Sequence, residues 1–379
     1  MTAGAGQRPR PRYSPPRFGV EEEFLVVDPV TRKVAADATT IVDRARARLG
    51  TRVSGEITKL QVETKTEPCT STRELTGQLI EARRVVADCA RADGLRIMAS
   101  GTPVLSGAVP PPITEGPRQA RGMATYRGLH DEQSICAVHV HVELPDRDRA
   151  LKVSNHLRPL LPTLITLTAN SPYWEGRDTG YASWRTVTWS RWPVAGPPPY
   201  FTSAAHYDQV VRTLSDAGAL VDAGTIFWDV RPSPRQPTLE IRVADVPITP
   251  QESAAFAALV RALVVAAGEA VDRGEPGPAV RDELMRVAYW QAARDGIWGS
   301  GLDVSTGCLV PAAQLVHRLV DSVRPVLTEF GDDELVADWT RRWCADGTGA
   351  VRQRTAAGRR GQLTDTVDHL IEQTAPLAG

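Results

Sequence analysis

The sequence predicts an α+β protein in which a β-sheet is backed by helices and the C-terminal part is helical. Three observations predict this class. Before Ser253, short segments with apolar residues at every second position alternate with helix-like segments. In several of these segments the intervening positions carry charged side chains, as on the polar face of an antiparallel sheet. After Ser253 nearly the whole chain has helix-like patterning.

Composition limits the possible functions. The 379 residues contain 42% hydrophobic and 23% charged residues, which are ordinary globular values. With Lys+Arg 44 and Asp+Glu 45, the formal net charge is -1, so nothing favours a nucleic acid or an anionic membrane as partner. The 5 cysteines form no CxxC pair, which disfavours a disulfide framework and is typical of the cytoplasm.

Residues 1–17 are predicted to be a disordered N-terminal arm. They contain arginines and prolines but lack the apolar core of a signal peptide. Residues 18–379 are interpreted as a single elaborated domain. Its later apolar runs, such as FAALVRALVVAAGEAV, are interrupted by charge and are interpreted as core helices too short to span a bilayer.

The first elements follow from alternation and capping. FGVEEEFLVVDP, residues 18–29, and ITKLQVETKTEP, residues 57–68, predict strands. A helix is predicted over 71–91, where Ser71 and Glu74 have capping-box spacing. LRIMASGT predicts a short strand next. Residues 101–117 are rich in proline and glycine and predict a long loop of the kind that often carries function.

The middle of the chain predicts a pocket between further strands. ICAVHVHVEL, residues 135–144, predicts a strand followed by a long helix ending near Asn170. Residues 171–201 combine tryptophans, arginines and turn residues without clear periodicity and are interpreted as a pocket wall. TIFWDVRPSP and TLEIRVADVP predict two more strands before the helical part begins.

The two faces of the predicted strands differ in chemistry. Valine, leucine and isoleucine occupy one face, and carboxylates, histidines and arginines the other. For any single strand a solvated sheet face explains this pattern, but recurring carboxylates beside a histidine favour a shared binding site. The polar-face residues include Glu21, Glu23, Glu63, His139, His141, Glu143, Asp229, Arg231, Glu240 and Arg242.

Converging carboxylates repel one another unless cations neutralise them. An oxygen-rich set with one histidine favours Mg²⁺ or Mn²⁺ over Zn²⁺. Magnesium commonly bridges nucleotide phosphates while arginines contact the transferring phosphoryl group. Neither a P-loop nor a GxGxxG fingerprint is present, so a nucleotide would be held through metals on the sheet.

Seven long motifs make the chain similar to a known family. They are FGVEEEF, QVETKT, CAVHVHV, LTANSPYWEGRDTGYASWRT, DVRPSPRQPTLEIRVAD, YWQAARDG and GTGAVRQR. From about Phe18 to Arg354 the chain resembles the carboxylate-amine ligases related to type-two glutamate-cysteine ligase. The resemblance implies a curved, mainly antiparallel, glutamine-synthetase-like sheet with helices behind it. It also implies ATP-dependent joining of a small carboxylate to a small amine through an acyl phosphate, with release of ADP and phosphate. A homodimer is the assembly that the resemblance implies.

The resemblance also implies roles for individual residues. The expected metal ligands are Glu21, Glu23, Glu56, Glu63, His139 and Glu240. Glu63, His139 and Arg242 are the expected catalytic residues, and Arg242, His139 and Arg294 are expected to contact ATP. Arg185 and Arg191 are candidates for binding a substrate carboxylate, with surface stacking on tryptophan as the alternative.

Two departures from the family pattern affect the expected substrates. Glu143 stands where many relatives have glycine, and Gln119 follows Arg118 where an aromatic residue is common. Glutamate with cysteine is therefore only one candidate substrate pair.

Three other functions remain open from the sequence. His139-x-His141 beside carboxylates also suits an amidohydrolase-type metal hydrolase, although that motif is expected early in a parallel barrel. A cupin-like oxygenase also uses HxH on a strand, but Glu143 follows too soon for its spacing. A nucleotide-binding protein without turnover is the third, which the complete acidic set disfavours.

Overall fold

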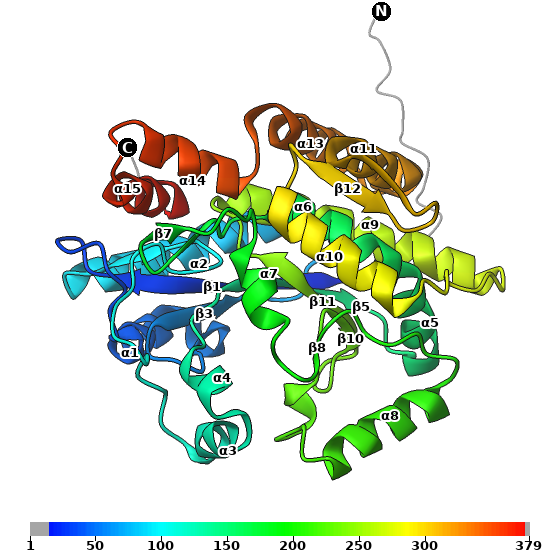
Figure 1. Ribbon diagram of the computed structural model, residues 1–379, viewed down its shortest axis with the longest axis horizontal. Coiled ribbons are helices and arrows are strands. Elements are labelled where there is room, and N and C mark those ends of the chain that lie inside the picture. The colour runs from blue at the N-terminus through cyan, green and yellow to red at the C-terminus, as the bar shows by residue number, and fades with distance from the viewer. Residues whose placement is uncertain (1–14, 376–379) are drawn as a thin grey trace, which may run out of the picture.

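A seven-stranded antiparallel sheet forms the centre of the computed structural model, which describes residues 15–375 (Figure 1). Every strand pair in this sheet is antiparallel, as the sequence predicts. The strand order is β10 (Val230–Pro232), β11 (Thr238–Asp245), β5 (Ala137–Glu143), β1 (Phe18–Val27), β3 (Gln61–Lys65) and β2 (Val53–Gly55), with β4 (Arg96–Met98) pairing with β1.

The apolar face of the sheet packs on helices. Val20, Val140 and Ile241 belong to one buried cluster with side chains of the helix behind them, because alternate residues of neighbouring strands point to the same side. In Figure 1 the helices α2, α6, α9 and α10 lie on this side. The helices around this cluster are α2 (Thr72–Ala92), α5 (Arg147–Leu157), α6 (Leu161–Thr168), α9 (Pro250–Asp272) and α10 (Asp282–Asp295).

Helix α9 corrects one expectation from the sequence. Its length and composition would allow it to cross a membrane, whereas the sequence predicts only apolar runs that are too short to do so. Its most apolar window is 78% buried inside the protein, which is how the central helix of a packed core behaves. A capping box between Thr249 and Glu252 fixes its start.

The polar face of the sheet is partly covered by short elements, here called the cap. The cap comprises α3 (Pro117–Tyr126), α4 (Gly128–Asp131), α7 (Trp184–Trp189), the parallel bridge of β8 (Ala195–Gly196) with β9 (Phe227–Trp228), and the 3-10 turn Ala223–Thr225. In Figure 1, α3 and α4 lie on the opposite side of the sheet from α9. The gap between sheet and cap contains a cavity of about 560 Å³.

Several elements differ from the sequence prediction. Helix α1 (Ala38–Leu49) and strand β2 were not expected; α1 buries Ile41, Val42 and Ala45 at helical spacing but has no side-chain N-cap hydrogen bond. The predicted long helix is divided into α5, the 3-10 turn Arg158–Leu160 and α6, since Pro159 and Pro162 interrupt its main-chain hydrogen bonds.

The C-terminal part packs around this core. It contains α11 (Ala312–Ser322), α12 (Arg324–Phe330), α13 (Asp333–Asp346), α14 (Gly349–Gly358) and α15 (Leu363–Thr374), and the hairpin β12 (Ser300–Asp303) and β13 (Cys308–Pro311). The remaining elements are α8 (Ala204–Asp216), the 3-10 turn Gly50–Arg52 and the short pair β6 (Tyr173–Trp174) and β7 (Arg177–Asp178).

Most of the predicted N-terminal arm, residues 1–14, lies outside the described residues. Arg17 at its end is held by Glu143, which accepts hydrogen bonds from the Arg17 main chain at 3.1 Å and from its guanidinium at 3.1 Å. Glu143 therefore faces the chain terminus and does not line the cavity.

Candidate active site

Strand alternation divides the three consecutive glutamates of β1 between two environments. Glu22 points into the core, where its carboxylate pairs with Arg83 and accepts a hydrogen bond from the Nε atom at 3.0 Å. Both side chains are almost fully buried. Glu21 and Glu23 point to the other face and line the cavity. The paired Glu22 thus belongs to the packing of the sheet on its helices.

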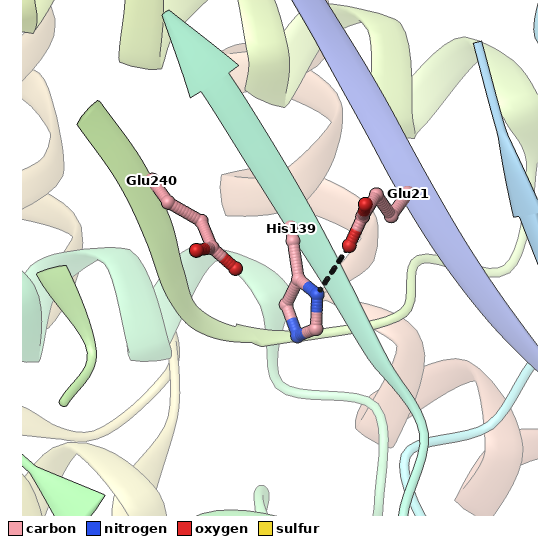
Figure 2. A group of neighbouring side chains, drawn as sticks. All are labelled: Glu21, His139 and Glu240. Carbon is pink, nitrogen blue, oxygen red and sulfur yellow. Dashed lines mark hydrogen bonds and ion pairs between the residues drawn. The ribbon is translucent and has the colours of Figure 1, made fainter. Parts of the chain in front are cut away.

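Three neighbouring strands bring Glu21, His139 and Glu240 together. Figure 2 shows their side chains converging from β1, β5 and β11. One potential ligand atom from each lies within 4.8 Å of those of the other two, and His139 Nδ1 lies 3.2 Å from a Glu21 oxygen. Such a set is compact enough for all three to contact one cation.

A second group shares the same histidine. Glu23, Glu63 and His139 also place ligand atoms within 4.8 Å of one another, because Glu63 on β3 is directly opposite Glu23 on β1. Ser54 donates a hydrogen bond to Glu63 at 2.7 Å, and the Lys65 ammonium lies 2.7 Å from the same carboxylate. Glu56 lines this part of the cavity without belonging to either group.

The carboxylates of the second group are unfavourable as anions. Burial raises the pKa of Glu23 to about 7, and the adjacent Glu63 carboxylate adds to the increase. Burial and neighbouring carboxylates also raise the pKa values of Glu56 and Glu63. A divalent cation bound here would relieve both the desolvation and the repulsion.

In the first group, the carboxylates Glu21 and Glu240 are favourable as anions. Burial alone would raise the pKa of Glu21, but hydrogen bonds with His139 and His141 outweigh it and hold that pKa well below its usual range. For Glu240, burial is outweighed by Arg242 and then by Arg231, so its pKa is also lowered. Burial lowers the pKa of His139 to about 4, which keeps the ring neutral and able to act as a ligand.

The residues present therefore fit a hard divalent cation such as Mg²⁺ or Mn²⁺. The donors are carboxylate oxygens with one neutral imidazole, which is the composition that such cations accept. The Nε2 atom of His141 faces the same group, 3.8 Å from a Glu21 oxygen and 3.9 Å from a Glu240 oxygen.

A β-bulge interrupts β11 next to Arg242. The pairing of β11 with β5 shifts register between Ile241 and Ala244, and the carbonyl groups of Arg242 and Val243 lie at this irregularity. The buried guanidinium of Arg185 donates to these carbonyls, at 3.0 Å to Arg242 and 3.1 Å to Val243. The Arg242 side chain then reaches the cavity, where it pairs with Glu240 and lies 3.3 Å from His139 Nδ1.

Three arginines from the sequence prediction do not line the cavity. Arg185 is buried behind it, on the main chain of the bulge. The exposed Arg191 pairs with Glu132, and Arg294 pairs with Asp295 while stacking on Trp290. The structure therefore does not bring the proposed substrate-binding arginines, or Arg294 as a nucleotide contact, to the cluster of carboxylates.

Other cavity residues were not assigned roles from the sequence. Alternation places His141 and Arg231 on the polar face of the sheet, so the sequence pattern could have identified both as site residues. In the structure, Arg231 pairs with Glu240 through Nε at 2.9 Å. Trp189 and Trp192 of the lining lie within residues 171–201, the segment that the sequence identifies as a pocket wall, and Phe227 lies in the predicted strand TIFWDVRPSP. Tyr126 on α3 was not predicted, because its segment follows a proline-rich loop. The cavity has a volume of about 560 Å³.

Comparisons with known proteins agree with one another. The model of the family described as Glutamate-cysteine ligase family 2 matches residues 17–370. A putative glutamate-cysteine ligase 2-3 of Mycolicibacterium smegmatis is 45% identical over 362 residues, covering 95% of this chain and 98% of the relative. A putative glutamate-cysteine ligase 2-1 of Saccharopolyspora erythraea is 45% identical over 360 residues, covering 95% of both chains.

Solved structures share the fold at low sequence identity. A glutamate-cysteine ligase of Francisella tularensis in complex with AMP has a TM-score of 0.73 at 12% identity, covering 97% of this chain and 90% of that one. A bifunctional glutathione synthetase of Pasteurella multocida has a TM-score of 0.69 at 15% identity, covering 96% and 51%. The predicted fold class, an antiparallel sheet of the glutamine-synthetase-like kind backed by helices, is confirmed.

Proposed function

The chain belongs to glutamate-cysteine ligase family 2, and from this premise we propose that it joins a carboxylate to an amine at the expense of ATP. Membership confirms the resemblance noted in the sequence and makes the protein a ligase. The observation that carries the proposal is the convergence of Glu21, Glu23, Glu63, His139 and Glu240 with Arg242 in one cavity.

The two groups of ligands suit a nucleotide with its cations. The proposed ligands are Glu21, His139 and Glu240 for one Mg²⁺ or Mn²⁺, and Glu23, Glu63 and His139, with Glu56 nearby, for further contacts. Bound cations would neutralise the phosphates of ATP and the charge that develops during transfer. Arg242 and Arg231 would direct donors at the phosphate oxygens, and His141, which also lines the cavity, would add one more contact.

The proposed reaction has two steps. A carboxylate oxygen of the donor acid forms a bond to the γ-phosphorus as the bond from that phosphorus to the β-phosphate oxygen breaks, which gives an acyl phosphate and ADP. The amine nitrogen then bonds to the acyl carbon, the carbon–oxygen bond to phosphate breaks, and the nitrogen releases one proton. Arg242 holds the phosphoryl oxygens in place during both steps. No enzyme nucleophile is required.

The hydrolase alternative receives less support from the geometry. An amidohydrolase would use both histidines of His139-x-His141 as ligands, but only His139 belongs to the ligand groups found among the described residues. The ring of His141 instead shares a hydrogen bond with Thr238 at 2.9 Å. Location in the cytoplasm, assembly as a homodimer and the single-domain interpretation stay predictions.

The proposal is tested by measuring whether ADP release requires both an acid and an amine. Protein with ATP, Mg²⁺ and panels of small acids and amines should release ADP only when both an acid and an amine are present, and mass spectrometry should find their amide. The relatives' names make glutamate and cysteine the first pair to test. ADP release that never depends on the amine would exclude the ligase reaction.

Matched variants locate the activity. Glu21→Gln and Glu240→Gln should each lower kcat by about a hundredfold or more, because each removes a ligand charge from the cavity. Glu143→Gln is the control, since this carboxylate lies on β5 but pairs with Arg17 outside the cavity. Full activity in both of the first two variants would refute the assigned site.

A further inference from the structure

Lys65 lines the cavity and contacts both groups of candidate metal ligands. It lies on β3, two positions after Glu63 on the same strand face, and directly opposite Glu21 on β1. Its ammonium is 2.7 Å from a Glu63 oxygen and 3.8 Å from a Glu21 oxygen. Because Glu21 belongs to one ligand group and Glu63 to the other, a single flexible side chain lies between the two groups.

Lys65 is the only ion-pair partner of Glu63 between residues 15 and 375. The two sheet arginines that line the cavity, Arg231 and Arg242, both pair with Glu240 on β11. Strands β5 and β1 separate β11 from β3, so these arginines lie on the other side of the carboxylate cluster. The positive charge next to Glu63 therefore depends on one lysine.

A lysine at this position can change partners more easily than an arginine. The chain has 44 Lys and Arg residues, of which only Lys33, Lys59, Lys65 and Lys152 are lysines. An arginine beside a carboxylate would form two parallel hydrogen bonds in a fixed geometry, whereas an ammonium is a point charge on a flexible stem. The Lys65 side chain is 37% exposed, so the surrounding protein leaves it room to move within the cavity.

The Lys65 ammonium and a divalent cation compete for Glu63. A cation held by the second ligand group would contact this carboxylate, and its charge would then lie close to the ammonium. Like charges repel strongly at short range in a partly buried site. Ser54 donates a hydrogen bond to the same Glu63 oxygen that Lys65 contacts, so the carboxylate keeps one partner when the ammonium moves away.

We propose that Lys65 changes partners during substrate binding: its ammonium pairs with Glu63 in the metal-free protein and with a phosphate oxygen of ATP once a divalent cation has bound. The exchange weakens the binding of a free cation, which must displace the ammonium, and strengthens the binding of ATP to the cation-loaded protein. Arg118 in the cap also lines the cavity, but Asp222 already holds its guanidinium at 2.8 Å. This inference rests on the proposed function and adds to it a residue that binds the phosphates.

Two binding measurements on Lys65→Met test the exchange, because the expected changes have opposite signs. The nucleotide-free protein is titrated with Mn²⁺, followed by the electron paramagnetic resonance signal of free Mn²⁺. The protein in saturating Mn²⁺ is then titrated with the non-hydrolysable ATP analogue AMPPNP in a calorimeter. We expect the variant to bind Mn²⁺ about tenfold more tightly and AMPPNP about tenfold more weakly than wild type. Weaker binding of both would mean that Lys65 only orients Glu63, and tighter binding of both that its ammonium does not contact the phosphates; either result would overturn the inference.

Two further variants are matched controls. Ser54→Ala removes the other donor to the same Glu63 oxygen without a change of charge, so it should not tighten the binding of Mn²⁺. Lys59→Met removes a lysine that pairs with Glu115 outside the cavity, and both dissociation constants should stay within about twofold of wild type. Mn²⁺ binding as tight in either control as in Lys65→Met would contradict the assigned role. Wild-type protein that binds Mn²⁺ but not AMPPNP would refute the proposed nucleotide site and the exchange with it, whereas ADP release that never depends on an amine would refute the ligase reaction alone.

Discussion

At the residue scale, the role of a carboxylate depends on which strand face it occupies. Glu22 and Glu23 are adjacent and both buried, yet Glu22 has a bidentate partner in Arg83 while Glu23 faces another carboxylate. Removing one member of a fully buried pair costs about 3–5 kcal/mol, because the other charge is left uncompensated. Glu22 therefore contributes to the folded state, whereas Glu23, Glu56 and Glu63 are held in the cavity at a cost in stability.

This difference predicts that Glu63→Gln stabilises the metal-free protein. Burial and repulsion raise the pKa of Glu63, so its anion is less favourable in the folded state than in the unfolded state. The folded carboxyl stays protonated to higher pH, and its contribution to stability is lost as pH rises above the unfolded pKa. The amide never ionises, so the gain should grow between pH 5 and pH 8 to about 1 kcal/mol or more, measured by thermal unfolding in a chelator.

Saturating Mg²⁺ should reverse the order of the two proteins. Wild type binds the cation more tightly and gains more stability from it by mass action. Glu143→Gln serves as the control, since Arg17 holds the pKa of Glu143 below its usual value and this variant should show no gain at high pH. A Glu63→Gln protein that melts below wild type without cations at pH 8 would mean that its contacts with Ser54 and Lys65 dominate.

At the scale of elements, the bulge in β11 connects the packing of the cap to the chemistry of the cavity. Arg242 lies on the same strand face as Glu240, and Arg185 at the start of α7 donates to the carbonyls of Arg242 and Val243 at the bulge. Arg185 is also 3.9 Å from the buried Asp245, which accepts hydrogen bonds from Ser171 and Ser183. We interpret Arg185 as a positioning residue that acts through Arg242.

Arg185→Lys should therefore lower kcat about tenfold with little change in KM, because lysine cannot hold both carbonyls in the fixed geometry of a guanidinium. The sharper measurement is a double-mutant cycle. The loss in Arg185→Lys combined with Arg242→Lys should not exceed the loss in Arg242→Lys alone, since both changes disturb one contact. Additive losses would show that Arg185 acts independently. Arg191→Lys, an exposed arginine six residues later, should leave kcat unchanged.

The sequence predicts the main strands of the sheet but not the bulge or the helices of the cap. Period-two alternation located β1, β3, β5 and β11 and assigned Glu21, Glu23, Glu63, His139 and Glu240 to one face, which the structure brings together. Alternation carries no information on bulges, so it could not show that Arg185 turns toward the main chain. The cap was not predicted as helices because α3 follows a proline-rich loop and has no side-chain N-cap hydrogen bond.

At the scale of the whole molecule, one strand and one helix join the two large apolar cores. Phe18 and Val20 of β1 belong to one core, and Phe24 to Val27 belong to the other. Helix α2 is shared in the same way, with Leu75 and Leu79 in the first core and Ala82 and Val85 in the second. Neither core can lose its structure without disturbing an element of the other.

We therefore expect residues 18–379 to unfold as one cooperative unit. Scanning calorimetry of the metal-free protein should give a single transition, and the calorimetric enthalpy should equal the van't Hoff enthalpy. Two separable transitions would indicate two domains and would contradict the interpretation of the chain as a single one. Substituting Val85 with alanine, in the second core, should shift the whole transition to lower temperature without splitting it.

The long motifs identified the family and the fold from the sequence, because each predicted strand has a clear period-two pattern. No comparable pattern identified the substrates. Tyr126 and Trp192 lie 66 positions apart in the sequence, and only the folded cap places their rings 4.8 Å from each other. Residues that meet through irregular segments leave no periodic signal.

The anchoring of Arg83 has a consequence for synthesis on the ribosome. Its guanidinium binds Glu22 and also donates to the carbonyls of Ile248, at 2.6 Å, and of Thr374, at 3.3 Å. The ribosome makes Glu22 early, but the last of these partners emerges only when residue 374 has been translated. A nascent chain thus carries a carboxylate and a guanidinium whose burial is completed only after residue 374 has been made, and strand β1 reaches its final packing no earlier than that.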